Sequence, residues 1–136
     1  YSLVGTLSLA PDARHIAFAS SAAFGRSIIF IGDPSSQTYY QLGLNDLPIS
    51  WVSNNEVLMP DESDSKIWRV NVETKTQTLV GNLKFGDPST RVAGASADEN
   101  MKNILVLASQ HIEGTDALTR EQLFLVDAAC LAKSVP

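Results

Sequence analysis

The sequence has little of the chemistry that cross-links small domains. It contains one cysteine, Cys130, and two histidines, His15 and His111. A single cysteine cannot form a disulfide within the chain, and no Cys/His spacing suits a zinc site. We therefore expect no metal and no cofactor, and we expect Cys130 to be a small, half-buried side chain.

Long apolar runs are also missing. No stretch approaches the ~20 apolar residues of a membrane-spanning helix. The chain begins at Tyr1, no charged segment precedes an apolar one, and no Asn-x-Ser/Thr sequon occurs. We expect that a targeting segment has been removed or that the chain is excised from a longer one. The sequence itself leaves the compartment open.

Basic clusters are absent as well. The chain carries 10 Lys and Arg against 15 Asp and Glu, a net charge of −5, and no two basic residues are adjacent. This dispersal argues against nucleic acid and anionic membranes as partners. With 136 residues, 44% of them hydrophobic and 18% charged, the chain has the length and composition of one globular domain.

What the sequence does contain is a repeat. A turn followed by an apolar strand occurs at residues 9–19, again at 51–59 and again at 95–108. The turn residues Asp12, Asn54 and Asp98 are 42 (54 minus 12) and 44 (98 minus 54) positions apart. A four-stranded propeller blade repeats every ~40–45 residues. The spacing therefore predicts blade-type units.

The second half of each unit repeats too. Apolar strands at residues 27–33, 66–71 and 122–127 end in the turn residues Asp33, Asn71 and Asp127. Short strands are expected after them at 38–42, 76–80 and 133–135. Residues 110–121 form an insertion in the third unit, and we expect a surface loop there that could hold a short helix over 115–121.

The predicted fold is all-β, with about three four-stranded antiparallel β-propeller-type blades in one domain, residues 1–136. The units cover approximately residues 7–44, 47–82 and 92–136. Propellers close with about 4–8 blades, so three units make a partial propeller. The chain could be part of a longer propeller, two copies could associate, or the units could form an open stack.

The first turn and strand, residues 10–18, resemble the TolB-like (PD40) propeller repeat, with Ala13 where glycine is usual. Residues 49–58 and 66–71 are similar to the N-terminal propellers of prolyl-oligopeptidase-like (S9) serine peptidases, whereas the third unit departs most, with Ala97 in place of proline. The resemblance implies a scaffold that binds partner proteins or gates a hydrolase domain. It also implies an extracytoplasmic or periplasmic home.

Isolated residues offer weak chemical candidates. Ser96 lies in the nearest approach to Gly-x-Ser-x-Gly, which lacks the final glycine, and we expect a blade-opening turn there. His15 is expected at a turn edge. His111, with Glu113 and Asp116 nearby, could bind a metal or move a proton, but a solvated loop explains it.

Other candidates also have simple explanations. The acidic cluster Asp61, Glu62, Ser63 and Asp64 could bind Ca²⁺, but a polar hairpin accounts for it without an EF-hand pattern. Residues 81–89 form a linker, not a phosphate loop. The remaining candidates are aromatic residues, which we expect to be packing residues, although a propeller rim could use them to hold a ligand: Trp51, Trp68, Tyr39, Tyr40 and Phe124.

No catalytic, cofactor-binding or metal-binding residue is therefore assigned. The leading hypothesis is a non-catalytic propeller module that offers a protein-binding or scaffold surface. The alternatives are a fragment of the gating propeller of an S9-like peptidase whose hydrolase domain is absent, and a self-associating structural β protein. The expected partner is a protein, the missing blades of a larger propeller, or a second copy of the chain.

Overall fold

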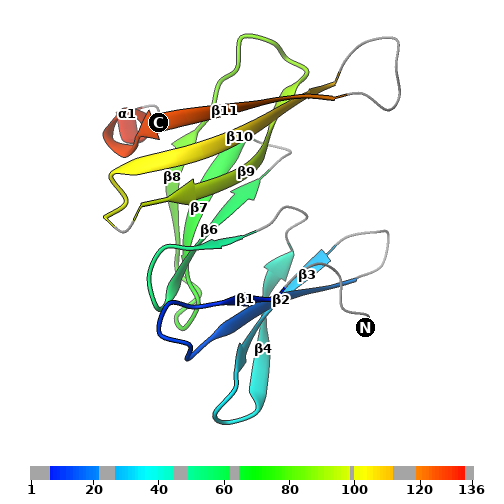
Figure 1. Ribbon diagram of the computed structural model, residues 1–136, viewed down its shortest axis with the longest axis vertical. Coiled ribbons are helices and arrows are strands. Elements are labelled where there is room, and N and C mark those ends of the chain that lie inside the picture. Colours follow the sequence, from blue (N-terminus) through cyan, green and yellow to red (C-terminus); the bar gives the residue numbers. More distant parts are fainter. Residues whose placement is uncertain are drawn as a thin grey trace.

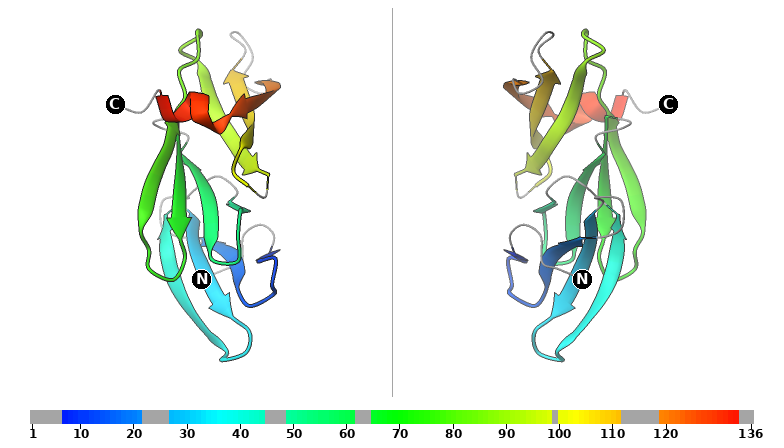
Figure 2. Two further views of the ribbon diagram at one scale, coloured as in Figure 1. Left: turned by 90° about the vertical axis from the view of Figure 1, so that its left-hand side faces the viewer. Right: turned by 90° about the vertical axis from the view of Figure 1, so that its right-hand side faces the viewer.

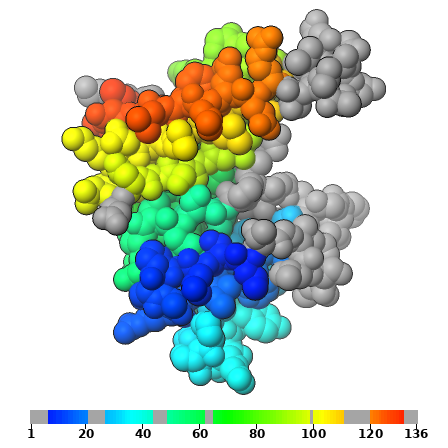
Figure 3. Space-filling model, viewed as in Figure 1, coloured from blue at the N-terminus to red at the C-terminus, as the bar shows by residue number. Residues whose placement is uncertain are grey.

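The computed structural model describes residues 7–21, 27–44, 49–61, 65–98, 100–111 and 119–133. Within those ranges the chain forms three antiparallel sheets, which follow one another along the sequence, and one short helix (Figure 1). The space-filling view shows the same succession, from blue and cyan at the N-terminal end to yellow and orange at the C-terminal end (Figure 3). The predicted class, all-β with blade-type sheets, is confirmed.

Sheets 1 and 2 have four strands each, and every strand pairs with the one before it in the sequence. Sheet 1 consists of β1 (Ser8–Leu9), β2 (Ile16–Ser21), β3 (Ser27–Asp33) and β4 (Thr38–Leu44). Sheet 2 consists of β5 (Ser50–Trp51), β6 (Glu56–Asp61), β7 (Lys66–Asn71) and β8 (Gln77–Asn82).

Sheet 3 departs from this plan. It consists of β9 (Thr90–Ala97), β10 (Asn103–His111) and β11 (Thr119–Asp127), and helix α1 (Ala128–Lys133) follows. The fourth strand predicted over residues 133–135 is wrong at Lys133, which ends the helix, while 134 and 135 lie outside the described residues. The reason is local, because the sequence after Asp127 is rich in alanine, the best helix former.

The insertion in the third unit is also shorter than predicted. β10 and β11 pair over their full lengths, from Asn103 opposite Asp127 to His111 opposite Thr119. The prediction of a loop over residues 110–121, with a helix over 115–121, is therefore wrong at 110–111 and 119–121, which are strand. Residues 112–118 lie outside the described ranges. The continuing cross-strand hydrogen bonds satisfy backbone groups that a loop would leave to water.

The third strand of every unit ends in the same way. Oδ1 of Asp33 accepts a hydrogen bond from the backbone N–H of Ser35 at 2.9 Å, and Oδ1 of Asn71 accepts one from Glu73 at 2.9 Å. Oδ1 of Asp127 accepts one from Ala129 at 2.8 Å. By bonding to the backbone two residues ahead, each of these side chains stabilises the turn that follows its strand. In the third unit the same contact caps the start of α1 instead of a hairpin.

The backbone hydrogen bonds align the blade-opening turns of the first and third units. The residues that correspond in this alignment differ from those that the sequence suggests. The backbone N–H of Ala10 bonds to the carbonyl of His15, and that of Asp98 bonds to the carbonyl of Asn103. Ala13 and Met101 occupy the same place in these turns, with φ of 62° and 56°. Asp98 therefore corresponds to Ala10 and not to Asp12. Its carboxylate holds this turn, and the hydrogen bond from the backbone of Asn103 lowers its pKa.

Sheet 2 lies between the other two sheets, as Figure 2 shows with its strands in green. We call one side of each sheet its front face and the other its back face. In sheet 2 the front face holds Val57, Met59 and Val70, and the back face holds Leu58 and Ile67. All five side chains are buried. Strand β6 is thus buried on both faces, through Val57, Leu58 and Met59.

Two cores hold the sheets together. In the first, the front face of sheet 2 packs on the back face of sheet 1, which contributes Ala17, Ile29 and Ile31. In the second, the back face of sheet 2 packs on the front face of sheet 3, which contributes Val92, Ala95, Ile104 and Val106. Each sheet thus places its back face against the front face of the next.

The first strands of the sheets are also tied together by side chains. Nε1 of Trp51 donates to the carbonyl oxygen of Ser8 at 3.1 Å, which joins β5 to β1. Oγ of Ser50 donates to the carbonyl oxygen of Ala95 at 2.8 Å, which joins β5 to β9. Because both acceptors are backbone atoms, the contacts fix the spacing of the strands and do not depend on side-chain identity in the neighbouring sheets.

Candidate functional site

The weak catalytic candidates do not come together. Ser96 lies within β9, opposite Leu105, and not in the turn that was predicted for it. His15 lies between sheets 1 and 2. Its Nδ1 is 3.3 Å from the carbonyl oxygen of Asn54, its Nε2 is 3.9 Å from Glu73, and its ring stacks on Trp51. Ser96 and His15 therefore lie in different sheets' surroundings, Ser96 within sheet 3 and His15 against sheet 2.

The acidic candidates form no site in the described part of the chain. Asp61 ends β6, and Glu62, Ser63 and Asp64 lie outside the described residues, as do Glu113 and Asp116. His111 ends β10, but its side chain is not described. Among the residues that can be placed, no group of three or more His, Cys, Asp or Glu could hold a metal ion.

The predicted linker begins within β8, and its later residues form a local turn. Oδ1 of Asp87 accepts hydrogen bonds from Ser89, at 2.7 Å from the hydroxyl and at 2.8 Å from the backbone N–H. The hydroxyl contact is the main reason why the pKa of Asp87 is lowered. Gln110 of β10 donates to the other carboxylate oxygen. These contacts anchor the segment that leads from sheet 2 into β9.

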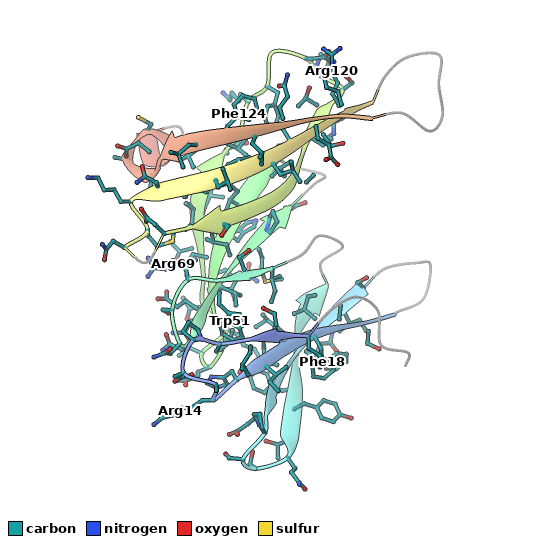
Figure 4. All side chains as sticks on the ribbon, viewed as in Figure 1. Arg14, Phe18, Trp51, Arg69, Arg120 and Phe124 are labelled. Atoms are coloured by element: carbon teal, nitrogen blue, oxygen red, sulfur yellow. The ribbon has the colours of Figure 1, made fainter. Side chains whose placement is uncertain are left out.

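Three of the five aromatic candidates pack as predicted. Trp51, Trp68 and Tyr40 lie against the core between sheets 1 and 2. The hydroxyl of Tyr40 donates to the carbonyl of Val72, and burial, followed by the charge of Glu73, raises its pKa. Figure 4 shows Trp51 between the strands of sheet 1 and those of sheet 2.

The other two aromatic predictions are wrong. Tyr39 is 68% exposed and Phe124 is 40% exposed. Cys130, which was expected to be half-buried, is exposed as well. The alternation along β4 explains Tyr39, because it points to the face opposite Tyr40. Phe124 lies in β11, which is an edge strand of sheet 3 in the part of the chain that the structure describes (Figure 4).

The back face of sheet 3 carries a cluster of exposed leucines. Leu125 is 73% exposed, Leu123 is 66% exposed and Leu105 is 42% exposed. Leu105 lies opposite Leu125, and Leu107 lies opposite Leu123, so the four side chains form two adjacent pairs on one face. Burying the exposed parts, on the order of two whole leucine side chains, would contribute roughly 3–6 kcal/mol.

The surroundings of this leucine cluster are small and uncharged. Gly94 and Ser96 of β9 lie beside Leu107 and Leu105 on the same face. The nearest charged positions on this face along the register are Arg91 and Glu121 at one end of the sheet and Asp127 at the other. The centre of the back face can therefore be covered without removing a charge from water.

The front face of sheet 1 carries an aromatic cluster that is partly buried: Phe30 is 8% exposed, whereas Tyr39 is 68% exposed. The rings of Phe18 and Phe30 stack with centroids 5.4 Å apart, and Tyr39 contacts both of them edge-on. Leu9, which pairs with Ile16, is 55% exposed beside them. Across this face, from Leu9 in β1 to Gln41 in β4, none of the paired residues that share the face is charged.

Comparison with known proteins finds similarity at the level of fold. No protein-family model matches the chain, and no curated protein matches it. Among solved structures, a candidate conserved lipoprotein from Clostridium novyi NT aligns with a TM-score of 0.65 and 15% identity, over 93% of this chain and 93% of that chain. The chain is thus similar to that protein over nearly the whole of both chains.

Two further similar structures come from proteases. The β-propeller domain of the Trilobed protease from Pyrococcus furiosus, described as having an open velcro topology, aligns with a TM-score of 0.56 and 12% identity over 90% of this chain. The tricorn protease aligns with a TM-score of 0.51 and 13% identity over 88% of this chain. The aligned regions are 40% and 11% of those chains. The sheets therefore belong to the β-propeller class of fold.

The leucines of sheet 3 and the pair Phe18 and Phe30 were not predicted from the sequence. A signal for them was present. Residues 104–108 and 123–126 are apolar at every position, and such runs predict strands that are buried on both faces. Because sheet 3 ends the described stack, one of its two apolar faces remains exposed.

Proposed function

We propose that the chain is a non-catalytic β-propeller-type module that binds protein through an apolar end face. The observation that carries this proposal is the leucine cluster on the back face of sheet 3, where Leu123 and Leu125 are two-thirds or more exposed. Contiguous exposed apolar surface of this kind marks interaction sites. Its uncharged centre suits the core of a protein interface, from which charged residues are depleted.

Non-catalytic action is supported by the separation of the candidate groups. A serine nucleophile needs a base within hydrogen-bond reach, which is in turn held by a third group. Ser96 is on β9, whereas His15 lies against Trp51 and Glu73 between sheets 1 and 2. Peptidase and esterase assays of the chain are expected to be blank. Reproducible hydrolysis that Ser96→Ala abolishes would overturn this part of the proposal.

Binding can be tested by placing a photo-crosslinking amino acid at Leu123 in the natural host. We expect a defined adduct, whose partner is identified by mass spectrometry and which disappears when Leu125→Glu is added. The matched control places the crosslinker at Gln122, the neighbouring residue, whose side chain points to the opposite face of β11. Equal adducts from both positions, or none from Leu123, would contradict the proposal.

In a second candidate function, the chain forms part of the gating propeller of a peptidase. It is favoured by the similarity to propellers of two proteases and by the S9-like residues 49–58 and 66–71. The sequence of the complete gene decides it. A downstream Gly-x-Ser-x-Gly followed by Asp and His would support the peptidase, whereas further repeats and a stop codon would favour a TolB-like propeller.

An extracytoplasmic home belongs to the same proposal. It is supported by the TolB-like residues 10–18, and one similar structure is described as a candidate lipoprotein. Fractionation of cells that express the natural gene tests it, and recovery in the cytosolic fraction alone would contradict it. In the described part of the chain no helix has the length and apolar character to cross a membrane.

A further inference from the structure

The back face of sheet 3 has a raised half and a low half. Two rows across the sheet each join a leucine of β11, a leucine of β10 and a small residue of β9: Leu123, Leu107 and Gly94, and Leu125, Leu105 and Ser96. Leu123 and Leu125 are 66% and 73% exposed. A Cβ atom placed on Gly94 would have Cβ of Leu107, 3.8 Å away, as its nearest contact beyond the neighbouring residues. The described residues therefore leave room over β9 that the leucines fill over β11.

Charged residues border this face at both ends. At one end Arg91 of β9 and Glu121 of β11 both flank Ser109 of β10, so opposite charges lie at opposite edges of the sheet. Nη1 of Arg91 donates to two backbone carbonyl oxygens of its own segment, which holds the guanidinium group at this end. At the other end the carboxylates of Asp98 and Asp127 accept hydrogen bonds from N–H groups of their own turns, so they need no partner from another molecule.

A second copy fits this face when a two-fold axis along β10 relates the two chains. Such an axis places β11 of each copy over β9 of the other. Three pairs then meet across the interface: Leu123 over Gly94, Leu125 over Ser96, and Glu121 over Arg91. The raised half of each copy enters the low half of the other, as the close packing of an interface core requires. A two-fold axis across the strands would instead stack the leucines of β11 on one another.

We infer that two copies of the chain associate through the back faces of sheet 3, related by the two-fold axis along β10. This inference rests on the proposed function and names the partner. The equivalent face of sheet 2 is covered by a sheet, so the association repeats a kind of contact that the molecule already makes. Because three strands offer a small interface, we expect a dissociation constant in the micromolar range.

Sedimentation velocity of the 136-residue chain over a range of concentrations tests the inference. The wild type should pass from the mass of one chain to the mass of two. Leu123→Glu places a carboxylate in the apolar contact and should weaken association about a hundredfold. The matched control Gln122→Glu introduces the same charge at the neighbouring residue, which faces the other side of β11, and should associate like the wild type. Circular dichroism checks that both variants are folded.

Charge substitutions test the direction of the axis. Glu121→Arg brings two arginines together in each symmetric contact and Arg91→Glu brings two glutamates together, so each variant alone should associate about tenfold more weakly. In an equimolar mixture every such contact joins an arginine to a glutamate, and the one-to-one complex should recover the affinity of the wild type. Gln122→Arg controls for the added positive charge and should have no effect. High salt should reduce the differences, since the charges are at the rim.

The axis across the strands predicts a different result. It would set residue 121 against Asp127 and residue 91 against Asp98 of the second copy. Glu121→Arg would then strengthen association, and its mixture with Arg91→Glu would bind more weakly than Glu121→Arg alone. Either result would overturn the inferred arrangement.

Other outcomes overturn the inference and leave the proposed function distinguishable. A wild type that stays monomeric at the highest attainable concentration excludes the second copy, and so does a dimer that Leu123→Glu leaves intact. Neither result rejects the proposed function, because a specific adduct between Leu123 and another protein would still support binding through this face. Failure of both the mass measurement and the crosslink would reject the inference and the proposed function together.

Discussion

Leu131 of helix α1 lies directly against Gly81 of β8. A methyl group at position 81 would fall 2.9 Å from Cβ of Leu131 and 3.1 Å from its Cδ2. Through this contact Leu131 joins the core between sheets 2 and 3, where it is 6% exposed. The glycine therefore allows the helix to approach the outermost strand of sheet 2.

We expect Gly81→Ala to lower the free energy of unfolding by about 1–3 kcal/mol, because the added methyl group overpacks a closed contact. Gly43→Ala is the matched control, since Gly43 also follows a bulge in the fourth strand of its sheet and has no atom within 4 Å of an added Cβ. That variant should be unchanged or stabilised by up to about 1 kcal/mol. Urea unfolding measures both, and equal effects would contradict the contact.

The same contact predicts coupling between the two residues. Leu131→Ala alone should destabilise the chain, because it removes a buried side chain. In the Gly81→Ala background the smaller side chain removes the contacts of the new methyl group with Cγ and Cδ2 of Leu131, although the contact with Cβ remains. The double variant should therefore be less destabilised than the two single effects together, and strict additivity would mean that the residues do not touch.

The ion pair of Glu56 and Arg69 predicts a pH dependence. Nε and Nη2 of Arg69 donate to the two oxygens of Glu56, both at 2.7 Å. These hydrogen bonds lower the pKa of Glu56 below its usual 4.5. The contribution of the pair to stability is thus complete above the unfolded pKa and is lost as the pH falls through the lower folded value.

We expect Glu56→Gln to cost about 0.5–1 kcal/mol at pH 7, because both partners are partly exposed to solvent. The difference from the wild type should shrink as the pH falls below 4.5, the usual pKa of Glu56. Denaturant unfolding at several pH values measures it. A difference that stays constant down to pH 3 would show that ionisation of Glu56 does not stabilise the fold.

We expect that replacing Ala13 by glycine stabilises the fold. Its φ of 62° lies in the left-handed region, which costs a residue with a Cβ atom about 1–2 kcal/mol. Ala13→Gly removes that cost at the expense of a more flexible unfolded chain, so a net gain of about 0.5–1 kcal/mol is expected. Ala19→Gly, within β2, should instead lose about 1 kcal/mol or more. Thermal unfolding compares them, and a loss at both positions would contradict the expectation.

We expect the fold to lose stability when Asp127 is replaced by alanine, but not when it is replaced by asparagine. Asp127→Ala removes the acceptor for the N–H of Ala129 and leaves the start of α1 uncapped, at a cost of about 1 kcal/mol. Asp127→Asn keeps a side-chain oxygen in place and should unfold close to the wild type. If both variants lost the same amount, the charge and not the cap would be responsible.

Much of the fold could be predicted from the sequence because its signals are local. Alternation of apolar residues marks the strands, and Asp33, Asn71 and Asp127 mark the ends of the third strands through hydrogen bonds to residues two positions away. The turn at Asp98 was harder to align. Its carboxylate binds Lys102 and Asn103, four and five residues ahead, whereas Asp12 binds Arg14, two residues ahead. The residue type is shared but its geometry is not.

The candidate surface could not be predicted in the same way. Trp51 and Tyr39 are both aromatic residues in strands, yet Trp51 packs against the core between sheets 1 and 2 and Tyr39 is 68% exposed. The difference depends on which face of which sheet has a neighbour. That is a property of the stack and not of the strand.

The sequence by itself therefore determined the strands, the turns that end them and the repeat that makes the sheets alike, because these follow from backbone conformation and hydrogen bonds over a few residues. Tertiary structure alone decided that Gly81 would admit a helix. It also decided that Leu123 and Leu125 would remain in water, although the equivalent face of sheet 2 is buried. The physical reason is that burial is a contact between distant segments, so an apolar strand has the same local pattern whether or not another sheet covers it.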